Sequence, residues 1–229
     1  SSVKNILTNP VCIKYSDIPG YFNTTVKGHD GSFYFGDYKG KYILIAVGRF
    51  HFYEGLSVEQ VGLPIQLFKK LGATKVILTN SAGCLQSKWT LGDVMIVNGH
   101  YDFTYRDSSK NPELVNGPNY YCEHLIQKAL KIKPDLRIGN YGWVLGPMYE
   151  TKAEIDNMKK HGVNSVGMST VPEILMAHKL ELDILVLSLM SNYAIGLTND
   201  DLNHQIVLDN SVKYNKNFKL LLLSILSEI

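Results

Sequence analysis

Short runs of consecutive apolar residues alternate with longer amphipathic segments along most of the chain. Runs of this length are typical of strands that are buried on both faces, as in a parallel sheet covered by helices. The pattern predicts strands at residues 33–38, 42–47, 75–79, 93–97, 142–145, 165–167 and 184–189, with a hairpin turn between the first two. Residues 1–30 lack the pattern and are expected to be irregular.

Capping motifs mark the starts of three predicted helices. In such a motif a Ser or Thr oxygen accepts from the backbone N–H three positions on, and a Glu or Gln there reaches back. The motif occurs at Ser57 with Gln60, Thr151 with Glu154, and Thr170 with Glu173. The predicted helices are residues 57–71 with a bend at Pro64, 120–130, 151–162, a helix from 170 onward, and 208–229. We therefore expect one α/β domain over residues 1–229, with a mixed, largely parallel β-sheet flanked by helices.

The composition narrows the function classes. The 229 residues are 45% hydrophobic and carry a formal net charge of +2, which suits one globular core and argues against a nucleic-acid binder. Cys12, Cys84 and Cys122 are too far apart for a disulfide framework or a zinc-binding Cys pair, which indicates a reducing compartment. No segment approaches the roughly 20 apolar residues of a membrane span, so a cytoplasmic protein without a metal or a membrane partner is expected.

Polar and small residues follow five of the predicted strands directly. These groups are residues 48–55, 80–84, 146–150, 167–169 and 190–192. Ligands of open α/β sheets lie beyond the carboxyl ends of the strands. The five groups are therefore expected to line one cavity.

One half of this cavity has the chemistry of an anion site. Arg49 offers a planar set of donors and His51 adds another. Ser169 precedes a helix, where the dipole and free N–H groups favour an anion. Ser81 and Ala82, predicted to lie in a loop, can offer backbone N–H groups. Together these groups could hold one phosphate-sized dianion.

The other half suits a planar heterocycle. Tyr149 offers a stacking face, while Glu150 and Asn192 offer hydrogen-bond acceptors and donors.

Each of these side chains also has a purely structural interpretation. Arg49 could form an ion pair with Glu54 instead of binding an anion. The remaining alternatives are a buried core histidine at His51, a neighbour of the helix cap at Ser169, a helix N-terminal charge at Glu150, a core methionine at Met168 and a turn residue at Asn192.

Four of the runs, taken in order, resemble one family. Gly-Arg-Phe-His-Phe-Tyr-Glu-Gly at 48–55, Asn-Ser-Ala-Gly at 80–83, Gly-Pro-Met-Tyr-Glu-Thr at 146–151 and Gly-Met-Ser-Thr-Val-Pro-Glu at 167–173 resemble the trimeric purine nucleoside phosphorylases. The resemblance extends from about residue 11 to 229. It implies phosphate-dependent cleavage of purine nucleosides to the free base and a ribose or deoxyribose 1-phosphate. It also implies a homotrimer that needs no metal or organic cofactor.

The resemblance also assigns roles to individual residues. The phosphate would be held by Arg49, His51, Ser169, the backbone of Ser81 and Ala82, and His29 on a flap. The nucleoside would be bound by Tyr53 and Met168 at the sugar, His204 at the 5′-hydroxyl, and Tyr149, Glu150 and Asn192 at the base. Asn192, Glu150 and His51 would act in catalysis. Asn192 would donate to N7 or O6 of the departing purine, which favours 6-oxopurines such as those of inosine and guanosine.

The sequence departs from the family pattern in two places. Nothing before Val11 resembles the family's first strand and glycine-rich phosphate loop. The segment between residues 97 and 120 has no counterpart of the family's Arg-Phe-Pro stretch, which reaches the neighbouring subunit, although Tyr120 or Tyr121 could substitute. These departures support two alternative hypotheses. One is a catalytically weakened or inactive nucleoside-binding relative, and the other is a hydrolase.

Overall fold

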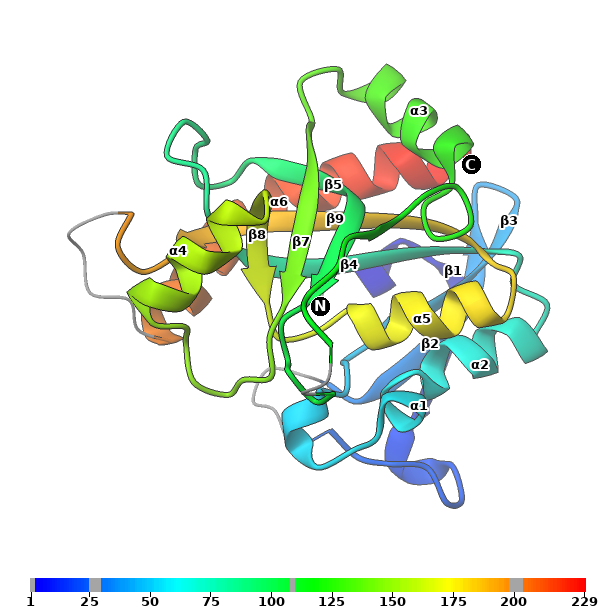
Figure 1. Ribbon diagram of the computed structural model, residues 1–229. Coiled ribbons are helices and arrows are strands. Elements are labelled where there is room, and N and C mark those ends of the chain that lie inside the picture. Colours follow the sequence, from blue (N-terminus) through cyan, green and yellow to red (C-terminus); the bar gives the residue numbers. More distant parts are fainter. Residues whose placement is uncertain (1–2, 25–29, 108–109, 198–203) are drawn as a thin grey trace.

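The chain folds into two β-sheets with helices on both sides of the larger one (Figure 1). The computed structural model describes residues 3–24, 30–107, 110–197 and 204–229. The larger sheet contains β4 (Lys75–Cys84), β5 (Val94–Asp102), β6 (Val115–Asn116), β7 (Arg137–Trp143), β8 (Val163–Gly167) and β9 (Asp183–Tyr193). Their order is β6-β5-β7-β8-β4-β9, and β9 also pairs with β5. The sheet therefore closes on itself, which the sequence pattern did not predict.

The sheet is mixed, as expected. Strands β4 and β9, β5 and β7, and β7 and β8 pair in parallel. Strands β4 and β8, β5 and β6, and β5 and β9 pair antiparallel. The α/β class and the mixed, largely parallel sheet flanked by helices are confirmed.

The smaller sheet is antiparallel and contains β1 (Thr8–Lys14), β2 (Ser32–Tyr38) and β3 (Lys41–Val47). The predicted hairpin is confirmed as β2 and β3. The expectation of an irregular segment over residues 1–30 is wrong, because it contains β1. All seven residues of β1 are exposed, so this edge strand carries no hydrophobic pattern that could reveal it.

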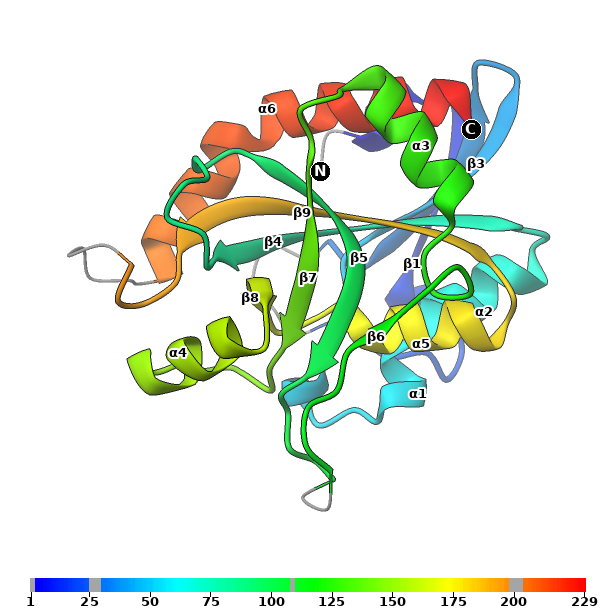
Figure 2. The ribbon, with the colours of Figure 1, turned by 45° about the horizontal axis from the view of Figure 1, so that its top comes forward.

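Helices cover both faces of the larger sheet. They are α1 (Val58–Val61), α2 (Leu63–Lys70), α3 (Glu123–Ile132), α4 (Lys152–Lys160), α5 (Val171–Lys179) and α6 (His204–Glu228). Short 3₁₀ turns occur at η1 (Val3–Ile6), η2 (Tyr15–Asp17) and η3 (Phe52–Glu54). Figure 2 shows α3 and α6 on one side of β9, with α1, α2 and α5 on the other. Within the described residues, no helix has both the length and the apolar character needed to cross a membrane.

Two of the three capping motifs are confirmed. Ser57 with Gln60 and Thr151 with Glu154 make both reciprocal hydrogen bonds. The third is wrong, since the side chain of Thr170 does not cap α5 and its φ of 76° lies outside the usual cap region.

The bend expected at Pro64 is a break at Gly62 instead, with Pro64 in the first turn of α2. A Cβ at Gly62 would lie 2.8 Å from Cβ of Met176, so this position lets α5 approach the break closely.

The predicted and observed strands differ at their C-terminal ends, where the candidate site residues lie. Strand β4 continues to Cys84 and β9 to Tyr193, so the groups 80–84 and 190–192 lie within strands and do not follow them. Strand β5 likewise extends beyond residue 97 to Asp102, whereas β7 already ends at Trp143. The extra residues of β4 and β9 pair with each other in parallel, and those of β5 pair with β7, which accounts for the extensions.

The small sheet is tied to the end of the last helix. The Nζ of Lys41, at the start of β3, donates to the carbonyl oxygens of Ser227 at 2.9 Å and Ile229 at 2.7 Å. A longer contact of 3.4 Å joins it to the carbonyl oxygen of Leu226. A cation at this place also complements the negative end of the helix dipole.

Candidate active site

Arg49, directly after β3, is fixed between β4 and α5. Its Nε donates to Oε2 of Glu173 at 2.7 Å, and its Nη1 donates to the carbonyl oxygen of Thr79 at 2.8 Å. The alternative ion pair with Glu54 is therefore wrong, since Glu173 in the first turn of α5 is the partner. Because Glu173 is buried, its carboxylate needs this partner.

Ser169 lies at the same end of β4 as Arg49. Nδ2 of Asn80 donates to Oγ1 of Thr170 at 2.9 Å, and that oxygen is 3.0 Å from Oγ of Ser169. Asn80 follows Thr79, the residue whose carbonyl oxygen binds Arg49. These links bring the two expected anion ligands from different loops to one stretch of β4.

His51 is oriented by the next acidic residue. Its backbone N–H donates to Oε1 of Glu54 at 2.7 Å, and its Nδ1 is 3.2 Å from the same oxygen. Its ring stacks on that of Tyr53 with 4.8 Å between centroids. Burial raises the pKa of Tyr53, and the neighbouring Glu54 and Tyr149 add to the effect. Because Tyr149 acts on the pKa of Tyr53, the two tyrosines lie in the same region of the site.

The two expected sugar contacts enclose a glycine. A Cβ at Gly146 would lie 2.5 Å from Sδ of Met168 and 2.8 Å from Cδ1 of Tyr53. Gly146 also has a φ of 74°, which side chains rarely adopt. Met168 and Tyr53 therefore converge, as expected, and Gly146 is required both by its backbone conformation and by the lack of space.

The expected base ligands are buried carboxyl and amide groups. Glu150 is 7% exposed, and burial raises the pKa of its carboxyl, with a smaller contribution from Glu154. Oδ1 of Asn192 accepts from Oγ of Ser191 at 2.9 Å, and its Nδ2 donates to the carbonyl oxygen of Tyr193 at 3.2 Å. Asn192 lies inside β9, so its interpretation as a turn residue is wrong. No hydrogen bond between described residues joins Glu150 to Asn192, and their joint binding of a purine stays a prediction.

Ser81 and Ala82 do not form the predicted loop. Both lie in β4, paired in parallel with β9, and the carbonyl oxygen of Ala82 accepts from Oγ of Ser191 at 3.4 Å. Phosphate binding by their backbone stays a prediction. His29 lies outside the described residues, as does the side chain of His204 at the start of α6.

The structure adds residues that the sequence analysis did not assign to the site. Asn80 was part of a quoted motif, while Thr170 and Glu173 were assigned to a cap. Tyr141 is buried in β7, just before the strand predicted at residues 142–145, so the pattern did not single it out. Burial raises its pKa, whereas the nearby Ser169 and the charge of Arg49 act in the opposite direction.

Tyr121 is not available to reach a neighbouring subunit. It is 3% exposed, and its hydroxyl is hydrogen-bonded to Nδ1 of His100 at 2.6 Å. Burial lowers the pKa of His100 to about 4, so this pair is neutral at pH 7. Tyr120 stacks on His178 with 3.9 Å between ring centroids.

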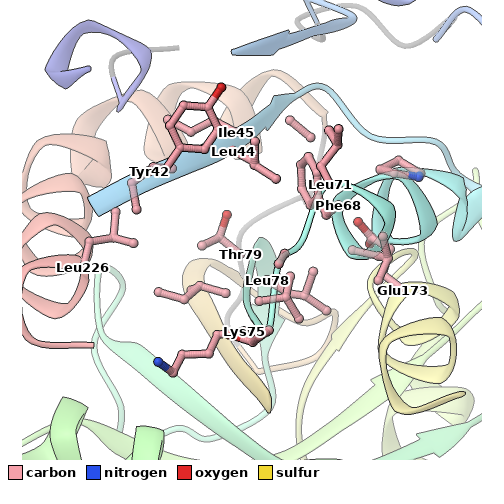
Figure 3. A pocket seen from close by; sticks show the side chains of 18 of the residues that line it. Tyr42, Leu44, Ile45, Phe68, Leu71, Lys75, Leu78, Thr79, Glu173 and Leu226 are labelled. Atoms are coloured by element: carbon pink, nitrogen blue, oxygen red, sulfur yellow. The ribbon is translucent and has the colours of Figure 1, made fainter. Parts of the chain in front are cut away.

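A cavity of about 740 Å³ adjoins the anion side of the site. Strand β3 and helix α2 form one wall and β4 another, with largely apolar side chains such as Leu44, Phe68 and Leu78 between them (Figure 3). Tyr42 lies at one end and Glu173 at the other. Among the described residues, β3 pairs with β2 only, and β4 pairs with β8 only at its last two residues. The two strands therefore present unpaired edges to the cavity.

The described residues contain no cluster of three or more His, Cys, Asp or Glu side chains that could hold a metal ion.

Comparison with known proteins gives consistent matches. A profile described as the phosphorylase superfamily matches residues 2–227. Purine nucleoside phosphorylase 1 of Bacillus subtilis (strain 168) is 36% identical, with 97% of this chain and 86% of that protein covered. Purine nucleoside phosphorylase of Rattus norvegicus is 33% identical over 89% of this chain and 76% of its own length. The crystal structure of Schistosoma mansoni purine nucleoside phosphorylase with inosine superimposes with a TM-score of 0.89 at 27% identity, covering 100% of this chain and 87% of that one.

Proposed function

Since the chain belongs to the purine nucleoside phosphorylases of the phosphorylase superfamily, we propose that it cleaves purine nucleosides with inorganic phosphate. The glycosidic C1′–N9 bond breaks, and its electron pair leaves with the base, which takes up a proton. A phosphate oxygen bonds to C1′, so that the products are the free base and a ribose or deoxyribose 1-phosphate. The observation that carries the proposal is the convergence of Arg49 and Ser169 on one stretch of β4.

On the phosphate side, Arg49, His51 and Ser169 bind the attacking anion. Glu173 and the carbonyl oxygen of Thr79 fix the plane of the Arg49 guanidinium before phosphate arrives. Such preorganised donors stabilise charge in the transition state without having to reorganise. The bound anion in turn stabilises the positive charge that develops on the sugar, as in other glycosyl transfers.

On the purine side, Asn192 donates to N7 or O6 of the departing base and Glu150 accepts from N1–H. The contact with the carbonyl oxygen of Tyr193 supports this role, because a carbonyl oxygen only accepts and so identifies Nδ2 of Asn192 as the donor end of the amide. A 6-oxopurine offers both of the required groups, and the solved relatives with hypoxanthine, inosine and guanosine carry such bases. Tyr149 stacks on the base, while Tyr53 and Met168 contact the sugar. His29 and His204 are proposed as phosphate and 5′-hydroxyl ligands on the resemblance alone.

We further propose that the cavity between β3 and β4 is the place of the family's additional strand and glycine-rich phosphate loop. The two unpaired edges support this assignment, since an extended segment between them would complete the backbone pairing. Arg49 and Glu173 line the same cavity, which supports a position for the end of such a segment next to the proposed anion ligands.

The remaining properties follow the family. We propose a homotrimer in the cytoplasm that uses inorganic phosphate as co-substrate and no metal or organic cofactor. The mass in solution, measured by light scattering, tests the assembly.

A single assay separates the proposed activity from its alternatives. Purified protein is incubated with inosine, with and without inorganic phosphate, and released hypoxanthine is measured. We expect release only with phosphate, and we expect Asn192→Ala to slow it by about 100-fold or more, as for other leaving-group donors. Equal release without phosphate would show a hydrolase. A nucleoside-binding relative would release no hypoxanthine with or without phosphate. Its melting temperature would be raised by added hypoxanthine but not by added phosphate.

A further inference from the structure

The segment that joins β8 to α5 makes a strained turn centred on Thr170. This residue has φ 76° and ψ −41°, and the N–H of Val171 donates to the carbonyl oxygen of Ser169 at 2.9 Å. These values describe a γ-turn with positive φ at its centre, which is rare for any residue with a side chain. Such a conformation is destabilising and persists only where the surroundings hold it.

A side chain from another strand holds the turn. Asn80 of β4 reaches Oγ1 of Thr170 with its Nδ2, at 2.9 Å, and Thr170 continues the contact to Oγ of Ser169 at 3.0 Å. The exposed fractions are 8% for Asn80, 0% for Thr170 and 8% for Ser169. The three groups therefore form a buried chain of hydrogen bonds that runs from β4 to the hydroxyl of Ser169.

The chemistry of the first donor sets the direction of this chain. An amide N–H can only donate, so Oγ1 of Thr170 accepts from Asn80. The proton of Thr170 then has Oγ of Ser169 as its acceptor among the described contacts. Ser169 is left with its own proton to donate elsewhere. In this orientation one N–H group of Asn80 is bonded to Thr170 and its carbonyl oxygen has no partner, whereas in the opposite orientation neither N–H group would be bonded to Thr170.

We propose that Asn80 and Thr170 are positioning residues that present the hydroxyl of Ser169 to phosphate as a donor. The inference rests on the proposed function, in which Ser169 contacts the phosphate co-substrate. The charged oxygens of phosphate accept hydrogen bonds, so a serine that presented a lone pair to them would repel the anion. The strained turn places the hydroxyl, and the chain from Asn80 orients its proton.

Thr170→Val tests the proposal, because it keeps the branched shape and removes the hydroxyl. We expect the KM for phosphate to rise about tenfold, while the KM for inosine stays within about twofold. Thr170→Ser, which keeps the hydroxyl, is expected to behave as the unchanged protein. Thr104→Val is the matched control, since Thr104 is also buried and hydrogen-bonded, to Asp102 and Arg106.

A double-mutant cycle identifies the route of the effect. If Thr170 acts through Ser169, adding Thr170→Val to Ser169→Ala should weaken phosphate binding no further. Additive losses, or equal rises in both KM values, would overturn the proposal. Should Thr170→Val fail to fold, Asn80→Ala combined with Ser169→Ala gives the same cycle.

Binding is also measured without turnover, by the shift of the melting temperature that inorganic phosphate produces. Absence of that shift in the unchanged protein would contradict the proposed function itself. A normal shift in the unchanged protein that Thr170→Val does not reduce would contradict only the positioning role.

Discussion

At the residue scale, the candidate site contains buried polar atoms that lack a partner. The hydroxyl of Tyr141 and Oδ1 of Asn80 are buried and make no hydrogen bond of acceptable geometry. Unpaired polar atoms of this kind destabilise a folded protein by about 1–3 kcal/mol each. Both atoms are close to Ser169, either directly or through Thr170. Two of the unsatisfied polar atoms among the described residues therefore lie where the expected anion ligands converge.

Tyr141→Phe tests this reading of the hydroxyl. Because the group has no partner, its removal is expected to leave the free energy of unfolding unchanged or to raise it by about 1 kcal/mol. Tyr121→Phe is the matched control, since its hydroxyl is bonded to His100, and it should lower that free energy by about 1 kcal/mol. Urea titration measures both changes. Equal losses in the two variants would mean that Tyr141 is hydrogen-bonded after all.

Glu150 should make stability depend on pH in a defined direction. Burial raises its pKa in the folded state above the ordinary 4.5, so its contribution favours folding below that value and is lost as the pH rises through the raised pKa. Glu150→Gln is therefore expected to raise the melting temperature at pH 7 but not at pH 4, and to slow turnover of inosine.

Glu154 should make stability depend on pH in the opposite direction. Hydrogen bonds from Thr151 lower its pKa, so its contribution to stability is present at neutral pH and is lost as the pH falls. Glu154→Gln should then lower the melting temperature at pH 7. Changes of the same sign in both variants would contradict this assignment of charges.

At the element scale, the sequence predicted those features that depend on interactions between residues close together in the chain. The hairpin of β2 and β3 and the caps of α1 and α4 depend on residues adjacent in sequence, and all were found from the sequence. Strand β1 was missed because it is exposed on all its residues. The cap expected at Thr170 was wrong because Asn80, 90 positions away, takes its hydroxyl. Contacts of this range leave no trace in a short window of sequence.

The break between α1 and α2 makes a prediction about helix packing. A Cβ at Gly62 would lie 2.8 Å from Cβ of Met176, while the φ of −77° is suitable for any residue. Gly62→Ala is therefore expected to lower the free energy of unfolding by about 1–3 kcal/mol through overpacking alone. In a Met176→Gly background, which removes that Cβ, the same substitution should have little effect. A full loss in that background would point to the backbone and not to the contact with α5.

At the scale of the whole molecule, the convergence of the site was predictable but its framework was not. Arg49, Ser169, Tyr53 and Met168 come together as the strand-end rule predicts. Closure of the sheet through β5 and β9 depends on pairing between strands about 90 residues apart. Ser81 and Asn192 lie in strands and not in the expected loops because β4 and β9, which are also far apart in sequence, pair along their whole length. The predicted joint binding of a purine by Glu150 and Asn192 depends on long-range geometry of the same kind.

The open edges of β3 and β4 should be visible in amide exchange. In the described residues, one edge of β4 pairs with β9 and the other faces the cavity. We expect amide hydrogens on the cavity edge to exchange faster than their alternate neighbours, which donate to β9. Exchange followed by NMR at single residues measures this difference. Equally slow exchange of all amide hydrogens along β4 would contradict an open edge, because it would mean that the edge facing the cavity is also hydrogen-bonded in solution.

The three carbonyl oxygens held by Lys41 have a mechanical consequence. Leu226 of α6 borders the cavity at the end away from Glu173 (Figure 3), and the ammonium group of Lys41 ties the end of this helix to the tip of the hairpin. Widening of the cavity at that end would require the loss of these charge-assisted contacts. A segment that inserts between β3 and β4 would therefore enter more easily from the opposite end of the cavity, next to Arg49 and Glu173.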